Sequence, residues 1–245
     1  RRPIQQTGGK IGLLIFRGVV GTFSLYLLFY AIQKLGLGRA SSYQYTYPIF
    51  LALFSWLLLS ERLNIKEWMA ILIGFIGILF VFRPDLSMSF RDNLLGIGTA
   101  VLTAISYLSV RQLGKIYDSR TIILSFMLSG IMMPIVSMLV GTYYPNPDWD
   151  FLIGTFQWPH TFSQWVGFLA LGITALVGQQ LLTKSFMHDK AGRVAAIGYS
   201  NILFSVIIGM LMGEAVPTKP MLIGIALIIA GGILVSWAKK KPKDA

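Results

Sequence analysis

Long apolar stretches, separated by short polar segments, follow one another along the whole 245-residue chain. Most are near 20 residues long, which is the length of helix that crosses roughly 30 Å of hydrocarbon. Helices of soluble domains average only about 11–12 residues. We therefore predict an all-α integral membrane protein with eight transmembrane helices. The predicted spans are 11–33, 40–59, 67–82, 94–112, 121–141, 162–186, 194–213 and 220–238.

Composition supports this prediction and excludes several chemistries. Hydrophobic residues make up 55% of the chain and charged residues 13%, whereas soluble domains carry about 25% charged residues. The formal net charge is +11, but the basic residues lie in short connections and a tail, so we expect no nucleic-acid partner. The chain has no cysteine, which excludes disulfides and thiolate metal sites. We expect neither a metal nor a cofactor.

The distribution of Lys and Arg predicts the orientation in the membrane. Most of these residues fall in alternate connections, on the side that also holds both ends of the chain. The positive-inside rule then places both termini in the cytoplasm and the protein in the inner membrane as a multi-pass protein. The connection 142–161 lacks Lys and Arg and is expected on the opposite side, with its aromatic residues at the headgroup level.

Two parts of the sequence resemble each other. Gly38-Arg39, Glu61 and Gly77 recur as Gly192-Arg193, Glu214 and Gly231, at a spacing of 153 or 154 residues. By the predicted topology the two copies lie on opposite sides of the membrane, so the repeat is inverted. Inverted repeats suit alternating access, because the two halves can exchange roles around a site near the midplane.

The repeat also predicts the domain organisation. Residues 1–86 form the remainder of a first repeat with three spans, residues 92–238 form a second repeat with five, and residues 239–245 are a basic cytoplasmic tail. If the two halves are equal, two further spans are expected upstream of Arg1, which gives ten in all.

Residues 48–63, PIFLALFSWLLLSERL, resemble the signature of EamA-type transporters of the drug/metabolite transporter superfamily. The resemblance continues through Arg17-Gly18, Gly74, Gly77 and Arg83-Pro84, and in the second copy through Glu214 and 224–231. It departs at Asn201, where the first copy has Pro48. It implies a transporter of ten helices in two inverted bundles and leaves the substrate open. It also implies structural roles for the motif residues Glu61, Gly77, Arg83, Pro84, Glu214 and Gly231.

The second span begins with an unusually polar run at 40–48. Pro48 cannot donate a backbone hydrogen bond and displaces the carbonyl of Gln44, four residues earlier. That carbonyl must then be satisfied by protein, water or ligand at membrane depth. Tyr43 and Tyr47 share a helix face with Gln44. The matching span of the second copy holds Tyr199 and Asn201 at similar depth, so these residues are candidates to line a substrate cavity. The alternative is that they only bond neighbouring helices.

Further polar residues lie inside spans. Arg17 could extend to the headgroups or face a water-filled cavity, where it would favour an anionic group on the substrate. Gln179 and Gln180 lie deeper in their span, and at least one must turn away from lipid. Together with the residues above, they complete the list of cavity candidates. His188 is expected in a solvated loop.

These features favour a secondary transporter, an exporter or exchanger of a small organic metabolite such as an amino acid or a related compound. A membrane scaffold or receptor-like protein without flux remains the main alternative. An intramembrane enzyme is disfavoured, because the sequence holds no HExxH motif, no GxSxG motif and no pair of acidic residues within a span. The expected partners are the lipid bilayer and a small-molecule substrate, and the oligomeric state is open.

Overall fold

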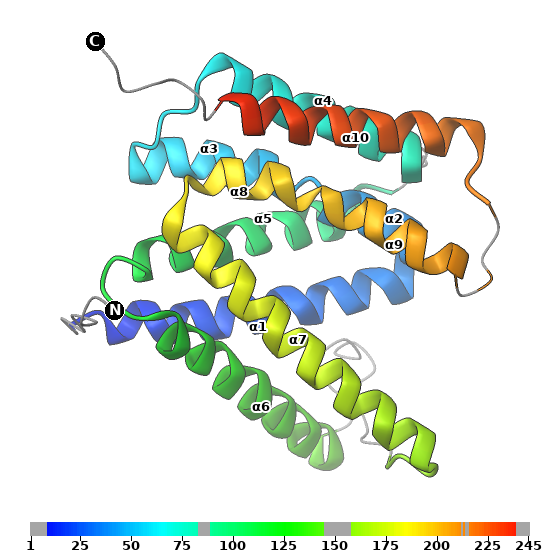
Figure 1. The fold of residues 1–245 in the computed structure, drawn as a ribbon. Coiled ribbons are helices and arrows are strands. Elements are labelled where there is room, and N and C mark those ends of the chain that lie inside the picture. Colours follow the sequence, from blue (N-terminus) through cyan, green and yellow to red (C-terminus); the bar gives the residue numbers. More distant parts are fainter. Residues whose placement is uncertain (1–8, 83–88, 145–157, 212, 214–215, 239–245) are drawn as a thin grey trace. The chain divides into compact units, whose positions relative to one another are not determined.

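The computed structural model describes residues 9–82, 89–144, 158–211, 213 and 216–238, and the elements in these ranges are helices. They are α1 (Ile11–Leu35), α2 (Leu37–Gln44), α3 (Tyr47–Leu59), α4 (Ile65–Phe82), α5 (Phe90–Leu113), α6 (Ser119–Tyr143), α7 (Phe162–His188), α8 (Ala191–Gly198), α9 (Ser200–Leu211) and α10 (Lys219–Ala238) (Figure 1). The prediction of an all-α membrane protein is confirmed.

Each predicted span corresponds to a helix or to a pair of helices. Six of the eight match single helices, whereas the second span is divided into α2 and α3 and the seventh into α8 and α9. The placement of His188 in a loop was wrong: it is the last residue of α7, and its Nδ1 atom lies 2.8 Å from the carbonyl oxygen of Lys184. The motif residues Arg83, Pro84 and Glu214 and the basic tail lie outside the described residues.

The surface of the long helices is apolar. By length and composition α1, α5, α6, α7 and residues 191–208 could each cross a bilayer. On α7, the side chains of Phe168, Leu169 and Ile173 are 59%, 66% and 56% exposed. A continuous apolar surface of this kind is unfavourable in water and is satisfied by lipid.

The chain forms two compact units. One combines residues 1–26 with 109–188, and the other combines residues 27–108 with 189–245. In the first unit, α1 lies against α6. The hydroxyl of Ser125 donates to the carbonyl oxygen of Leu14 at 2.5 Å, and the hydroxyls of Tyr26 and Ser137 are 2.8 Å apart. On α5, Arg111 donates to the carbonyl oxygens of Phe186 and Met187 at the end of α7.

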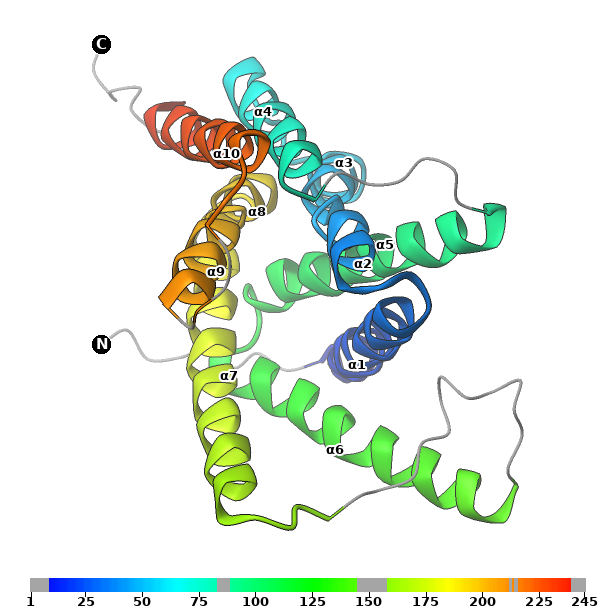
Figure 2. The same ribbon diagram turned by 90° about the vertical axis from the view of Figure 1, so that its right-hand side faces the viewer.

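In the second unit, α4 and α10 lie side by side and run in opposite directions (Figures 1 and 2). Glycines allow their backbones to approach closely. A Cβ atom on Gly77 would lie 2.6 Å from the carbonyl oxygen of Gly224, and one on Gly231 would lie 2.8 Å from that of Ala70. The motif glycines Gly77 and Gly231 are therefore contact points between these two helices.

The repeat predicted from the sequence is present in the helix bounds. The first and last residues of α2, Leu37 and Gln44, lie 154 positions before those of α8, and α4 and α10 begin 154 positions apart. The close contacts follow the same spacing, since the pair Gly77 and Gly224 becomes Gly231 and Ala70 when the repeats are exchanged. Because α2–α3 and α8–α9 also run in opposite directions, the repeat is inverted.

Local sequence explains how α3 ends and how α4 begins. Ser60 ends α3 in the left-handed conformation, with φ 55° and ψ 25°, and the amide of Glu61 then donates to the carbonyl oxygen of Ser55. This arrangement satisfies a carbonyl at the helix end and turns the chain. Before α4, the side chain of Asn64 accepts from the amide of Glu67, and the Glu67 carboxylate accepts from the amide of Asn64. This reciprocal pair is a capping box.

Asp118, in the connection that follows α5, caps the N-terminus of α6. Its Oδ1 atom accepts from the hydroxyl of Thr121 at 2.6 Å and from the amide of the same residue at 2.9 Å. The hydrogen bond from the Thr121 hydroxyl is the main reason why the pKa of the Asp118 carboxyl lies below its ordinary value.

The glycine contacts predict that two adjacent residues of α10 respond oppositely to substitution. Gly231→Ala places a methyl group against the backbone of α4 and should lower the free energy of unfolding by about 1–3 kcal/mol. Gly232→Ala meets nothing within 4 Å and should raise it by about 0.5–1 kcal/mol, because alanine loses less entropy in a helix. Thermal unfolding of the purified full-length protein in detergent measures both. Equal effects of the two variants would contradict the close contact.

Candidate functional site

The two divided spans are interrupted at equivalent positions. After α2, the amide of Tyr45 donates to the carbonyl oxygen of Ser41 at 2.9 Å. The Thr46 hydroxyl donates to the carbonyl oxygen of Tyr43 at 2.7 Å. Pro48, at the start of α3, has no amide hydrogen to continue the ladder. The helix therefore breaks at residues 45–46, just before Pro48.

The second break, at Tyr199, lies 154 residues after Tyr45. No proline follows it; instead the amide of Tyr199 donates to the carbonyl oxygen of Ala196 at 3.4 Å, and the amide of Ile202 donates to that of Tyr199 at 3.1 Å. Backbone that departs from α-helix at membrane depth is tolerated where it is buried in protein or lines a water-filled space. The paired breaks are therefore candidate positions for a polar ligand.

Tyrosines from three helical segments meet at the breaks. The rings of Tyr47 and Tyr107 are 5.4 Å apart and nearly perpendicular, at 69°. The hydroxyls of Tyr45, Tyr107 and Tyr199 are near enough to that of Tyr47 to interact with it electrostatically. A Cβ atom on Gly198 would lie 2.8 Å from the Tyr47 hydroxyl, so α8 approaches this tyrosine closely.

Amide and hydroxyl side chains complete the group. The Gln44 Nε2 atom donates to the hydroxyl of Thr103 on α5 at 2.9 Å. The Asn201 Nδ2 atom lies 3.5 Å from the Tyr45 hydroxyl, at the outer limit of a hydrogen bond. We call these residues the break cluster: Gln44, Tyr45, Tyr47, Thr103, Tyr107, Tyr199 and Asn201.

Two buried atoms of the break cluster have no hydrogen-bond partner among the described residues. They are the Oε1 atom of Gln44 and the hydroxyl of Tyr199. Tyr199 is only 1% exposed, and its ring lies against Gly74 on α4. A buried polar atom without a partner costs about 1–3 kcal/mol. Such atoms are therefore natural points for a ligand or water to bind.

The structure brings some of the predicted cavity residues together and separates others. Tyr47 and Tyr199 both belong to the break cluster. Asn201 hydrogen-bonds Tyr45, and Gln44 hydrogen-bonds Thr103; neither contact was predicted. Pro48 is buried at the start of α3.

Other predicted residues lie elsewhere. Tyr43 hydrogen-bonds Asn93 and lies against Gly96, at the first turns of α5. Arg17 belongs to the other compact unit, where it is 2% exposed and its guanidinium lies 4.4 Å from the centre of the Phe126 ring. Gln179 and Gln180 are half-buried on α7 of that unit.

Tyr45, Thr103 and Tyr107 were not among the residues predicted to line the cavity. Tyr45 could have been found, because it lies within the polar run 40–48 and precedes Tyr199 by the repeat spacing. Thr103 and Tyr107 share a face of α5, four residues apart. Nothing in the sequence indicated that this face would meet the first break.

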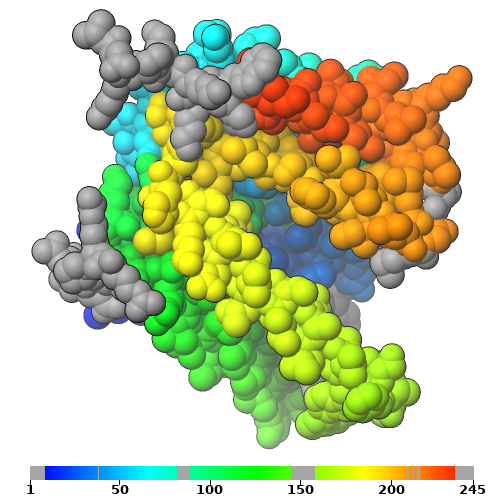
Figure 3. Space-filling model, in the orientation of Figure 1, coloured from blue at the N-terminus to red at the C-terminus, as the bar shows by residue number. Residues whose placement is uncertain are grey.

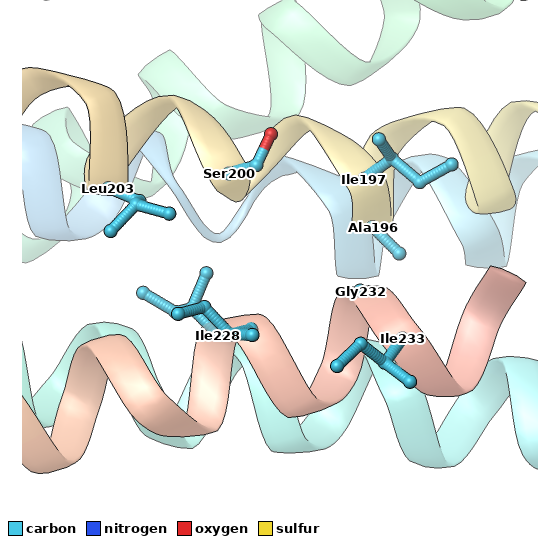
Figure 4. Close-up of a pocket in the computed structure, with 8 residues that line it drawn as sticks. Ala196, Ile197, Ser200, Leu203, Ile228, Gly232 and Ile233 are labelled. Carbon is cyan, nitrogen blue, oxygen red and sulfur yellow. The ribbon is translucent and has the colours of Figure 1, made fainter.

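A separate groove of about 370 Å³ lies between α8–α9 and α10 (Figures 3 and 4). Its walls are apolar except for the hydroxyl of Ser200, and Ile197, Ile229 and Ile233 are nearly half exposed. This lining suits an apolar molecule better than a polar substrate. Across the described ranges, His, Asp and Glu form no group that could hold a metal ion.

Comparisons with known proteins agree with this architecture. Residues 1–83 match the model of the EamA-like transporter family. The chain is 31% identical over 227 residues to the pseudopaline exporter CntI of Pseudomonas aeruginosa, covering 92% of this chain and 72% of that protein. An uncharacterised transporter of Helicobacter pylori is 28% identical over 236 residues, with 93% and 74% covered.

More distant matches extend to eukaryotes and to a solved fold. Mouse solute carrier family 35 member G1 is 27% identical over 223 residues, covering 86% of this chain and 57% of that protein. A crystal structure matches with a TM-score of 0.74 at 18% identity, over 96% of this chain and 79% of the other. This last likeness shows the fold alone.

The unpartnered Tyr199 hydroxyl predicts an unusual result. Tyr199→Phe removes a buried group that makes no hydrogen bond within the described structure, so the free energy of unfolding should stay the same or rise in the absence of substrate. Tyr26→Phe removes a hydroxyl bonded to Ser137 and should lower it by about 0.5–1.5 kcal/mol. Thermal unfolding of the two variants compares them directly. A loss in Tyr199→Phe as large as in Tyr26→Phe would mean that this hydroxyl is already satisfied.

Proposed function

Because the chain belongs to the EamA-like transporter family, we propose that it is a secondary transporter that exports or exchanges a small organic metabolite across the inner membrane. The break cluster is the proposed binding site. The observation that carries this proposal is the convergence of neutral hydroxyl and amide groups at two paired helix breaks, two of them with unused hydrogen-bonding capacity.

The chemistry of the break cluster favours a particular kind of substrate. The Gln44 Oε1 atom can accept from an N–H group, and the Tyr199 hydroxyl can donate to a carbonyl or carboxylate oxygen. Tyrosine rings around them offer flat apolar contact. A molecule with an amino group and a carboxyl group close together, such as an amino acid or a related compound, satisfies both atoms.

Export is proposed because the relative of 31% identity is named an exporter. A scaffold or receptor without flux is the remaining alternative, and it predicts no substrate-dependent transport in vesicles. Comparing the metabolites accumulated by cells with and without the full-length protein identifies the substrate.

Two substitutions test the site. Gln44→Ala and Asn201→Ala in the full-length protein should each weaken the apparent substrate affinity roughly 5- to 150-fold, since each removes one side chain proposed to hydrogen-bond the substrate, at about 1–3 kcal/mol. Uptake into inside-out vesicles over a range of substrate concentrations measures the change.

Tyr143→Phe and Ser185→Ala are suitable controls, because both residues are exposed and lie outside the break cluster. All four variants should insert into the membrane at normal levels. Unaltered affinity and rate in both Gln44→Ala and Asn201→Ala would place the substrate elsewhere and leave the break cluster a helix-packing contact.

Orientation is tested separately. We expect both ends of this chain in the cytoplasm and residues 142–161 on the opposite side. Since the chain has no cysteine, single cysteines at Lys240 and at Asp148 can be labelled with a membrane-impermeant thiol reagent in intact cells. Asp148→Cys should react and Lys240→Cys should react only after lysis. The reverse pattern would contradict the proposed topology.

A further inference from the structure

The first broken helix of the second unit, α2–α3, lies against α5. The rings of Tyr47 and Tyr107 are 5.4 Å apart, which brings α3 and the later part of α5 together. Near the beginning of α5, a Cβ atom on Gly96 would clash with the ring of Tyr43. The helix α5 therefore follows the face of the first broken helix that carries Tyr43 and Tyr47, and both tyrosines are partly buried.

The equivalent face of the second broken helix, α8–α9, is exposed. The repeat spacing of 154 residues takes Tyr43 to Ile197. It takes Tyr47 to Asn201, and Phe204 follows on the same face one turn later. Ile197 is 46% exposed, Phe204 is 58% exposed, and Asn201 is exposed as well. We call Ile197, Asn201 and Phe204 the open face of α8–α9.

An amide side chain on an exposed face is unfavourable if that face meets lipid. Asn201 lies within residues 191–208, a stretch long and apolar enough to cross a bilayer. Polar side chains in such stretches turn towards protein or water. The open face also adjoins the groove of about 370 Å³ between α8–α9 and α10, since Ile197 belongs to both (Figure 4). A neighbouring helix satisfies both features, because it can hydrogen-bond the amide and pack apolar side chains into the groove.

We propose that the open face is the seat of a further transmembrane helix, the repeat equivalent of α5, which the full-length protein contributes from upstream of Arg1. The spacing that relates the two repeats carries the whole of α5 to positions before Arg1, where the sequence repeat also predicts two further spans. The pseudopaline exporter has residues beyond the 72% of its length that this chain covers, so it is long enough to hold such a helix. The seat depends on the repeat and not on the proposed transport of a metabolite.

This helix completes the break cluster from the side of the second repeat. Tyr107 packs against Tyr47 in the first repeat, so its equivalent should lie against Asn201 in the second. The repeat spacing places that equivalent roughly 50 residues upstream of Arg1 and the equivalent of Gly96 roughly 60 residues upstream. Asn201 should therefore meet the later of these positions and Ile197 the earlier one. A molecule bound at the break cluster then touches a side chain that precedes Arg1.

Photo-crosslinking in the full-length protein tests the seat. The photoreactive amino acid p-benzoylphenylalanine replaces Ile197, Asn201 or Phe204 in separate variants, and the replacement at Phe204 keeps an aromatic side chain. Irradiated membranes are digested, and mass spectrometry identifies the crosslinked partners. Each variant should crosslink within one chain to a peptide upstream of Arg1. The peptide joined to Ile197 should lie about three turns of helix nearer the N-terminus than the one joined to Asn201.

Ile223 on α10 is a matched control. It is 52% exposed, and its repeat equivalent on α4, Met69, is 46% exposed, so both repeats leave this position to lipid. The same amino acid at Ile223 should give lipid adducts and no crosslink to an upstream peptide. Crosslinks from Ile197 and Phe204 to lipid alone, or to a second copy alone, would overturn the proposal. Upstream peptides found in the reverse order would also overturn it, because the helix would then not be the equivalent of α5.

Discussion

Backbone hydrogen bonding is the constraint on which this structure depends. In hydrocarbon no water is available to satisfy an amide or a carbonyl, so a spanning segment must satisfy its own. The long helices do this along their whole length and can therefore present apolar side chains to lipid. Among the described residues of the second unit, the breaks at Tyr45–Thr46 and Tyr199 depart from this rule. Each is covered by neighbouring protein, and the hydroxyl of Thr46 bonds a carbonyl at the first break. The same positions thus become the polar interior of an otherwise apolar bundle.

Two groups of described polar residues in the second unit, one neutral and one charged, have different physical consequences. The break cluster contains hydroxyls and amides, which can exchange one partner for another at modest cost. The charged group is the buried carboxylate of Glu67 with Arg193 and Lys190, and this carboxylate must keep its cationic partners or return to water. A neutral cluster suits reversible binding of a small molecule, whereas a charged cluster suits a contact that is either fully made or fully broken.

The extent to which this fold could be predicted follows from the same constraint. Span length and apolar composition located all eight spans, because the thickness of the bilayer fixes both. The repeat spacing identified Gly77 and Gly231, which the structure places at the contact of α4 and α10. Contacts between distant segments could not be predicted: the sequence did not indicate that Thr103 would meet Gln44 or that Tyr107 would meet Tyr47. Glu67 was taken only as the first residue of a span, because its burial depends on Arg193, 126 residues later.

The features that the two repeats share and the positions at which they differ have separate roles in this chain. The equivalent breaks and the exchanged glycine contacts come from features that both repeats retain, and such features can serve two alternating conformations equally well. A preferred direction of transport cannot come from these shared features, because two repeats with identical ends would give two conformations of equal free energy. It must come from positions at which the repeats differ, and Glu67 with its equivalent Met221 is one such difference in charge. A conservative replacement at such a position changes the balance between states without altering the substrate contacts, so direction and specificity can evolve independently.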